Sequence, residues 1–106
     1  MTNLLENIIV DKSKEEFLDI LKHENVRIER IVSNGQSSQK DFWYEQEENE
    51  FVLLLQGEAI LHIQEETQIK EVHLKANDFI DIKAHTKHRV EYTSKEQPSV
   101  WLAVFY

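Results

Sequence analysis

A succession of short strand patterns, separated by short turns, constrains the fold of this chain more than any other feature. From residue 26 onward, apolar and polar residues alternate with a period of two, and turn-forming residues recur about every 8–12 positions. Strands with this spacing are typical of an all-β sandwich or barrel. The expected strands are 26–33, Phe51–Leu55, Ala59–Gln64, Gln68–Leu74, Phe79–Lys83, His88–Thr93 and Val100–Tyr106.

The first 25 residues do not follow this alternation. Asn3–Val10 is short and apolar, which suits an edge strand or an arm that packs on another subunit. Ser13 and Glu16 have the spacing of a capping box, and the apolar residues that follow predict a short amphipathic helix over 13–22. The sequence therefore predicts one domain over residues 1–106, with an arm and helix in 1–25 and a β-barrel in 26–106.

Charge and composition exclude several classes of function. The formal net charge is −8 and no basic patch is visible, which argues against nucleic acid and anionic membrane surfaces as partners. The chain has no cysteine, so it can form neither a disulfide nor a thiolate site. No leader pattern and no apolar run of membrane-spanning length is visible, so a cytoplasmic location is expected.

The last expected strand, Val100–Tyr106, is apolar on both faces. One face can fill the barrel. The other face, to which we assign Trp101, Ala103 and Phe105, then needs a cover, because a large apolar sheet face is rarely left in water. A second subunit is the expected cover and predicts a homodimer; the alternative is coverage by the N-terminal segment alone.

Two histidines lie three residues apart: His85 precedes an expected strand and His88 begins it. His88 shares one strand face with Val90 and Tyr92, while the opposite face is fully polar, with Arg89, Glu91 and Thr93. His88 is therefore expected to point inward. An inward imidazole at this place is either a core histidine with satisfied hydrogen bonds or a ligand.

Glu50 begins the most apolar strand and shares its parity with Gln46 and Val52, so it is expected to face the interior. A buried carboxylate is costly unless it is paired or coordinated, and the alternative is an exposed residue of the acidic loop. Two imidazoles and a carboxylate, with a side-chain amide as a fourth donor, suit Fe, Mn, Ni or Zn. His23, His62 and His73 have no spacing partner, so solvated or structural roles are expected for these three.

The segments Trp43–Ala59 and Asn77–Glu91 together resemble a small single-domain cupin. Glu50 and Gly57 match the glutamate and glycine of the first cupin motif in spacing, and His88 matches the last histidine of the second. The resemblance covers about residues 26–106 of the chain. It implies a double-stranded β-helix, or jelly-roll, barrel.

The chain departs from the cupin pattern at several positions. Tyr44 and Gln46 stand where the first motif has paired histidines, and His85 stands at a glycine of the second motif. The resemblance implies a divalent transition metal in the barrel, with Tyr44 as a weaker candidate ligand. The set of ligands that we expect is Gln46, Glu50, His85 and His88. The alternative is a barrel that has lost its metal and keeps these residues as a hydrogen-bonded polar cluster.

Cupins host many activities, so the fold does not select one. The first hypothesis is a metal-dependent enzyme, of dioxygenase or isomerase type, acting on a small organic substrate, with Glu50 as ligand and then as catalytic base. Phe42, Trp43 and Tyr44 would line its entrance, and the acidic residues Glu45, Glu47 and Glu48 would disfavour highly anionic ligands. The alternatives are a binding or regulatory module without turnover, and a structural dimer with a vestigial pocket.

Overall fold

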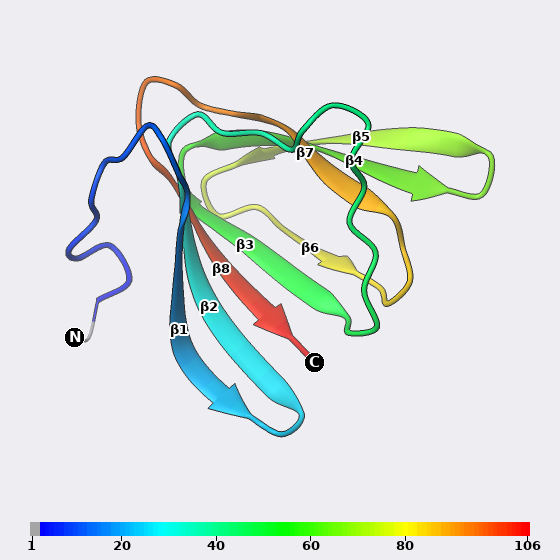
Figure 1. The fold of residues 1–106 in the computed structure, drawn as a ribbon, viewed down its shortest axis with the longest axis horizontal. Helices are drawn as coiled ribbons and strands as arrows, with labels where there is room; N and C mark the ends of the chain where they lie inside the picture. Colours follow the sequence, from blue (N-terminus) through cyan, green and yellow to red (C-terminus); the bar gives the residue numbers. More distant parts are fainter. Residues whose placement is uncertain (1–2) are drawn as a thin grey trace.

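The structure is a computed structural model that describes residues 3–106; Met1 and Thr2, which begin the predicted arm, lie outside the described residues. Within residues 3–106 the chain forms eight β-strands and no helix (Figure 1). The strands are β1 (Glu16–His23), β2 (Val26–Ser33), β3 (Glu50–Gln56), β4 (Glu58–Glu65), β5 (Gln68–Lys75), β6 (Phe79–Ile82), β7 (His88–Thr93) and β8 (Ser99–Phe105).

The strands form two sheets in which neighbouring strands are antiparallel. One sheet has five strands in the order β1-β2-β8-β3-β6, and the other has three in the order β5-β4-β7. The chain passes from the first sheet to the second between β3 and β4 through a single residue, Gly57. This arrangement confirms the all-β jelly-roll prediction. In the part of the chain that is described, no helix is long and apolar enough to cross a membrane.

The predicted helix over 13–22 is wrong. Residues 16–23 form β1, which pairs with β2 from Glu16 opposite Val32 to His23 opposite Val26. Ser13 caps no helix, because its backbone N–H and its hydroxyl both donate to the Asp11 carboxylate. Pairing with the edge of β2 satisfies the backbone groups of this segment that face β2, and that non-local gain outweighs the local capping pattern.

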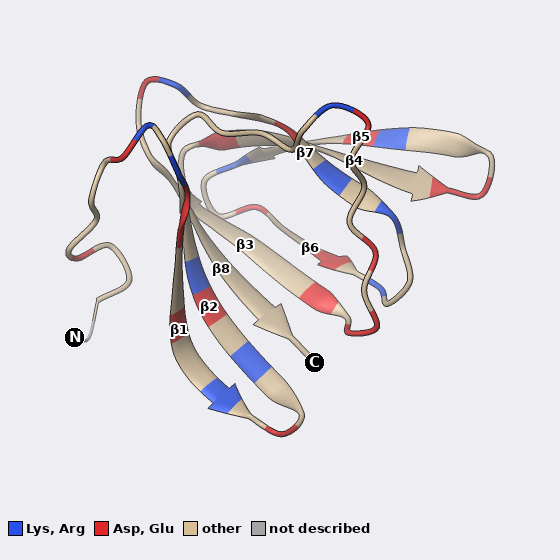
Figure 2. Cartoon of the chain, viewed as in Figure 1, with Lys and Arg blue, Asp and Glu red and all other residues tan. Residues whose placement is uncertain are grey.

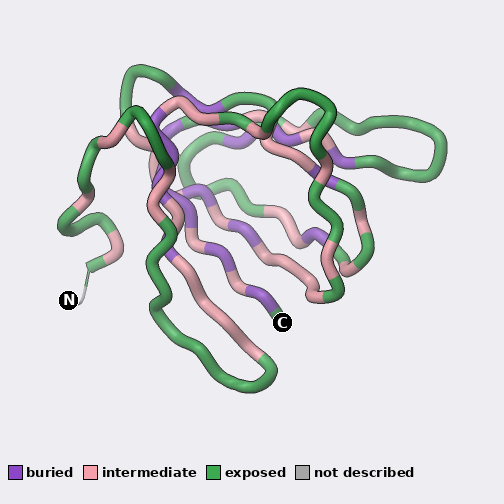
Figure 3. The backbone as a smooth tube through the Cα atoms, in the orientation of Figure 1, coloured by how far each residue is buried: buried purple, intermediate pink, exposed green. Residues whose placement is uncertain are grey.

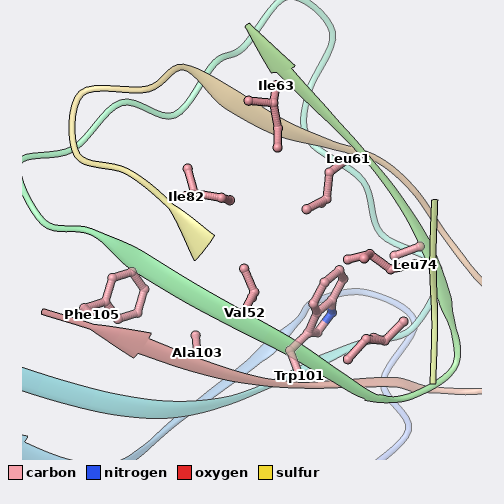
Figure 4. Packing of buried hydrophobic residues seen from close by; sticks show 10 residues of the cluster. Val52, Leu61, Ile63, Leu74, Ile82, Trp101, Ala103 and Phe105 are labelled. Atoms are coloured by element: carbon pink, nitrogen blue, oxygen red, sulfur yellow. The ribbon is translucent and has the colours of Figure 1, made fainter. Parts of the chain in front are cut away.

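The core lies between the two sheets. Side chains from both sheets point toward one another across the gap, as Figure 4 shows. The central strands β3 and β8 alternate between more and less buried positions, whereas the tips of the β1–β2 and β4–β5 hairpins are exposed (Figure 3). The buried apolar cluster consists of Val52, Leu54, Ala59, Leu61, Ile63, Leu74, Ile82, Trp101, Ala103 and Phe105.

The predicted faces of the last strand are inverted in the structure. Trp101, Ala103 and Phe105 belong to the core between the sheets, so they fill the barrel rather than wait for an external cover. Leu102 and Val104 therefore lie on the opposite face of β8. We call the face of the five-stranded sheet that carries Leu102 and Val104 the outer face. Because both faces of this strand are apolar, its sequence pattern does not distinguish the inner from the outer face.

Candidate functional site

A cavity of about 200 Å³ lies between the two sheets. Its apolar wall is made by residues of both sheets: Val52, Leu61, Ile82, Trp101 and Phe105, together with Phe17, Ile31 and Val90. Its polar wall is smaller and is contributed by Glu15, Glu29, Tyr44, Gln46, Glu50 and His88. A mostly apolar cavity with a few converging polar groups is the usual form of a small-molecule site.

Glu50, His88 and Gln46 meet in this cavity. Nε2 of His88 lies 3.3 Å from Oε1 of Glu50, and the Gln46 amide N–H donates to the same oxygen at 3.0 Å. The side chains of His88 and Glu50 are only 9% and 13% exposed. The inward orientation predicted for both residues agrees with this geometry, because each lies at the end of a strand whose apolar residues share its face.

Backbone hydrogen bonds hold the loop before β3 against the start of β7. Tyr44 and His88 exchange both backbone hydrogen bonds, at 2.8 and 3.0 Å, and the Tyr44 ring stacks on the imidazole with centroids 5.9 Å apart. Two residues further along the loop, the Gln46 carbonyl accepts from the His85 N–H at 2.8 Å. These contacts place Tyr44 and Gln46 beside His88, although more than 40 positions separate them in the sequence.

His85 does not join the cluster. Its backbone is left-handed, with φ at 64°, and its side chain is exposed and outside the cavity lining. The cupin pattern has a glycine at this position, and the left-handed backbone explains why, because glycine adopts positive φ at no steric cost. The structure thus brings together three of the four predicted ligands, Gln46, Glu50 and His88.

The contacts of His88 determine where its protons lie. Nδ1 faces the Thr86 carbonyl at 2.9 Å, and a carbonyl only accepts, so Nδ1 carries a hydrogen. Nε2 faces the Glu50 carboxylate, which also accepts when it is ionised. Burial lowers the pKa of His88, but the interaction with Glu50 and the Thr86 carbonyl raise it by more, and the net pKa lies above the ordinary value of 6.5. The geometry therefore favours an imidazolium paired with a carboxylate.

The environment of Tyr44 opposes its ionisation. Burial raises the pKa of the Tyr44 phenol, and the negative charges of Glu15 and Glu50 raise it further. A phenolate ligand needs the opposite shift. The hydroxyl of Tyr44 is therefore a neutral hydrogen-bonding group in the cavity.

The residues at the cluster fit a tight transition-metal site poorly. Such sites usually draw at least three strong ligands from the protein, whereas the cluster offers one imidazole and one carboxylate. Gln46 turns its amide N–H, and not its oxygen, toward Glu50. Across residues 3–106, no group of three or more His, Cys, Asp or Glu side chains is arranged to hold a metal ion.

The structure adds three cavity residues that the sequence patterns did not indicate. Glu15 reaches the cavity from the segment just before β1 and Phe17 from β1 itself, where a helix was expected. Glu29 reaches it from β2. The remaining histidines have the predicted roles where contacts are seen: His62 and His73 both bind the exposed Glu71 carboxylate. Strand pairing turns Phe17 and Glu29 toward the interior, and Glu15, just before β1, accepts a hydrogen bond from the Ser33 hydroxyl there.

The prediction for the end of β7 is wrong. The register between β4 and β7 shifts between Ile60 and Leu61, so that Leu61 pairs with Val90 but Ile60 pairs with Tyr92. This bulge turns Thr93 into the interior, where it is buried, and leaves Tyr92 exposed. Alternation therefore predicts the face of His88 and Val90 correctly but not the faces beyond the bulge.

Comparisons with known proteins agree with this architecture. No curated protein matches the chain. A solved structure described as a "putative mannose-6-phosphate isomerase" from Ralstonia eutropha JMP134 is 34% identical, with a TM-score of 0.91 over 99% of this chain and 95% of the other. A cupin superfamily protein from Desulfitobacterium hafniense DCB-2 is 19% identical, with a TM-score of 0.74 over 92% of this chain and 82% of the other.

A more distant likeness shows the fold alone. The hydroxypropylphosphonic acid epoxidase from S. wedmorenis is 14% identical, with a TM-score of 0.69 over 95% of this chain and 60% of the other. The family model that describes the cupin domain matches residues 29–105, which include both sheets except β1 and the first residues of β2. The chain belongs to the cupin domain family.

Proposed function

We propose that this protein is a small-ligand-binding cupin whose site is the cavity between the two sheets. The observation that supports this most is the convergence of Glu50, His88 and Gln46 on one side of a mostly apolar cavity. At about 200 Å³ the cavity is smaller than the roughly 300–1,000 Å³ of drug-sized pockets, which favours a small molecule. Its apolar body would pack against Trp101 and Leu61, and a polar group would meet the cluster.

Filling the cavity tests this proposal. Val90 lines the cavity from β7, so Val90→Phe should reduce the affinity for any small-molecule binder by at least about tenfold, since the ring would occupy the ligand's space. Binders are identified by their shifts of the Trp101 indole N–H signal in NMR spectra. Ile60→Phe on β4, outside the cavity lining, is the matched control. Equal affinity in both variants would place the binding site elsewhere.

The second candidate is a metal-dependent enzyme of isomerase or dioxygenase type. One distance favours it: the 3.3 Å between Nε2 of His88 and Oε1 of Glu50 is close to the spacing of two neighbouring ligands bound at about 2.1 Å. The solved structure that is 34% identical is described as a "putative mannose-6-phosphate isomerase". In this candidate Glu50, His88 and Gln46 would hold the metal, and Glu50 would also be the base. The exposed His85 imidazole would have to turn into the cavity to join them.

Elemental analysis of the purified protein distinguishes the two candidates. A near-stoichiometric transition metal in the wild type that is lost in His88→Ala would support the metal-dependent enzyme. No metal in either protein, also after incubation with Fe, Mn, Ni and Zn salts, would leave the ligand-binding proposal alone. The control variant His73→Ala removes an exposed imidazole from the outer side of the three-stranded sheet.

We also propose that two copies associate through the outer face of the five-stranded sheet. The strand registers place two rows of side chains side by side on this face: Leu21, Ile28, Val104, Phe51 and Asp81 in one, and Leu18, Arg30, Leu102, Leu53 and Phe79 in the other. All but Arg30 and Asp81 are apolar. The N-terminal segment covers part of the face, because Arg30 donates to the carbonyls of Leu4 and Glu6.

The part of the outer face near β3 and β6 includes a highly exposed ring. Phe79 is 65% exposed, and its ring lies 5.4 Å from that of Phe51. Phe79→Glu should therefore shift a dimer toward monomer in sedimentation velocity experiments, because the charge would be desolvated in the interface. Ile69→Glu on β5, where Ile69 is 55% exposed, is the matched control. A wild-type protein that sediments as a monomer would refute this proposal.

A further inference from the structure

The charged side chains that line the cavity are all acidic except for His88. Carboxylates reach it from three directions, with Glu15 before β1, Glu29 on β2 and Glu50 on β3. Among the described residues, no lysine or arginine belongs to the lining. Figure 2 shows an acidic residue at the start of β3 and acidic residues in the loop before it.

The available cations neutralise these carboxylates only in part. Glu50 faces His88, and Glu29 is bound by Arg27 at 3.1 Å, but Arg27 is shared with Glu48 at 3.3 Å. Glu15 accepts a hydrogen bond from the buried Ser33 hydroxyl and has no cationic partner among residues 3–106. The cavity therefore keeps a negative potential, which is least screened where the walls are dry.

A second, independent feature also favours a cation in the cavity. The aromatic rings of Phe17, Tyr44, Trp101 and Phe105 line the cavity, and the faces of such rings attract cations. The protein itself uses one of them in this way, because the Arg27 guanidinium carbon lies 4.1 Å from the centre of the Phe105 ring. The wall is thus already compatible with a stacked cation.

We propose that the ligand of this cavity is a small organic cation, an ammonium or guanidinium group on an apolar body. The cationic group lies between Glu15 and Glu50, where carboxylate charge and aromatic faces meet, and the apolar body packs against Val52 and Leu61. This inference rests on the proposed ligand-binding function and adds the charge class of the ligand. An anionic ligand would meet carboxylates from three elements and only one cationic side chain, that of His88.

Three probes of nearly equal shape test the charge class: cyclohexylamine, cyclohexanol and cyclohexanecarboxylate. Each is titrated into the protein at pH 7 and followed by NMR through the indole N–H of Trp101, a residue that lines the cavity and whose N–H donates to Ser33. Trp43, outside the lining, is the internal reference. The amine should bind at least about tenfold more tightly than the alcohol, and the carboxylate more weakly than both.

Variants then assign the preference to the carboxylates. Glu15→Gln keeps a hydrogen-bond acceptor for Ser33 but removes the charge, and it should reduce the preference for the amine over the alcohol by several fold. Glu50→Gln gives a second, separate measurement. Glu66→Gln, at the tip of the β4–β5 hairpin and outside the cavity lining, removes an equal charge and should leave the preference unchanged.

The outcomes separate the two proposals. If the alcohol or the carboxylate binds as tightly as the amine, the cavity binds ligands but the charge class is wrong. If none of the probes shifts the Trp101 signal at millimolar concentration, the ligand-binding function itself is refuted. If the amine preference persists in both Glu15→Gln and Glu50→Gln, its source is not the cavity carboxylates and the inference fails.

Discussion

Replacing Gly57 with alanine should cost much more stability than replacing Gly35, although both glycines have a left-handed backbone with φ of 98° and 91°. Gly57 is the residue through which the chain passes from the five-stranded to the three-stranded sheet. A Cβ placed there would lie 2.7 Å from the Cα and 2.9 Å from the Cβ of Ser99, and against its hydroxyl. Ser99 is fully buried, so it has no room to withdraw.

The surroundings of Gly35 are more permissive. A Cβ at Gly35 would lie 3.0 Å from Cγ of Lys95, which belongs to a flexible and exposed side chain. The left-handed backbone costs about 1–2 kcal/mol for alanine at either position. Overpacking adds about 1–3 kcal/mol at Gly57 alone. We therefore expect losses in the free energy of unfolding of about 2–5 kcal/mol for Gly57→Ala and about 1–2 kcal/mol for Gly35→Ala.

Urea unfolding followed by tryptophan fluorescence measures both losses, with the midpoint and the slope reported separately. A double-mutant cycle with Ser99→Gly sharpens the test, because this change removes the clashing hydroxyl and side-chain carbon but leaves the clash with the backbone of residue 99 and the left-handed conformation of residue 57. It should recover part of the loss of Gly57→Ala. A difference between the two glycine variants below about 0.5 kcal/mol, the usual scatter of such comparisons, would refute the steric argument.

Three further predictions concern individual side chains. The His88 pKa measured by NMR should lie above 6.5 and should fall in Glu50→Gln. Because the folded pKa is raised, the stabilisation by this pair is complete below about pH 6.5 and is lost as the pH rises through the folded pKa. A measured pKa below 6.5 would contradict the pairing. Arg30→Met should lower the free energy of unfolding by about 1–3 kcal/mol, since Arg30 is buried and lies 2.6 Å from Glu16. It should also accelerate amide exchange in residues 4–6, because Arg30 binds two carbonyls of this segment. Unchanged exchange would contradict this anchoring role. Leu54→Ala should cost about 2–5 kcal/mol in urea unfolding, because Leu54 is fully buried, and a loss below about 1 kcal/mol would show that the core collapses around it.

Several expectations stay predictions, because the fold of one chain does not test them. These are the single domain over residues 1–106, the cytoplasmic location, and the absence of nucleic-acid and membrane partners. The homodimer and the metal also stay predictions, which sedimentation and elemental analysis would test. The acidic loop residues predicted that anionic ligands would be disfavoured. Glu15, Glu29 and Glu50 act in the same direction and line the cavity itself.

The sequence by itself determined the strands of the barrel and two residues of the site. Alternation with a period of two is a local property, so it locates β2 to β8 to within a few residues. The same alternation places Glu50 and His88 on the faces that carry Val52 and Val90, and both point into the cavity. These predictions succeeded because each depends only on the residues of one strand.

Only the tertiary structure decided the partner of each strand, and with it the rest of the site. Residues 16–23 became a strand because the edge of β2 was available, and this pairing carried Glu15 and Phe17 into the cavity. A register shift against β4 decided which of Tyr92 and Thr93 is buried. The inner face of β8 was decided in the same way, because both of its faces are apolar and only the opposing sheet distinguishes them.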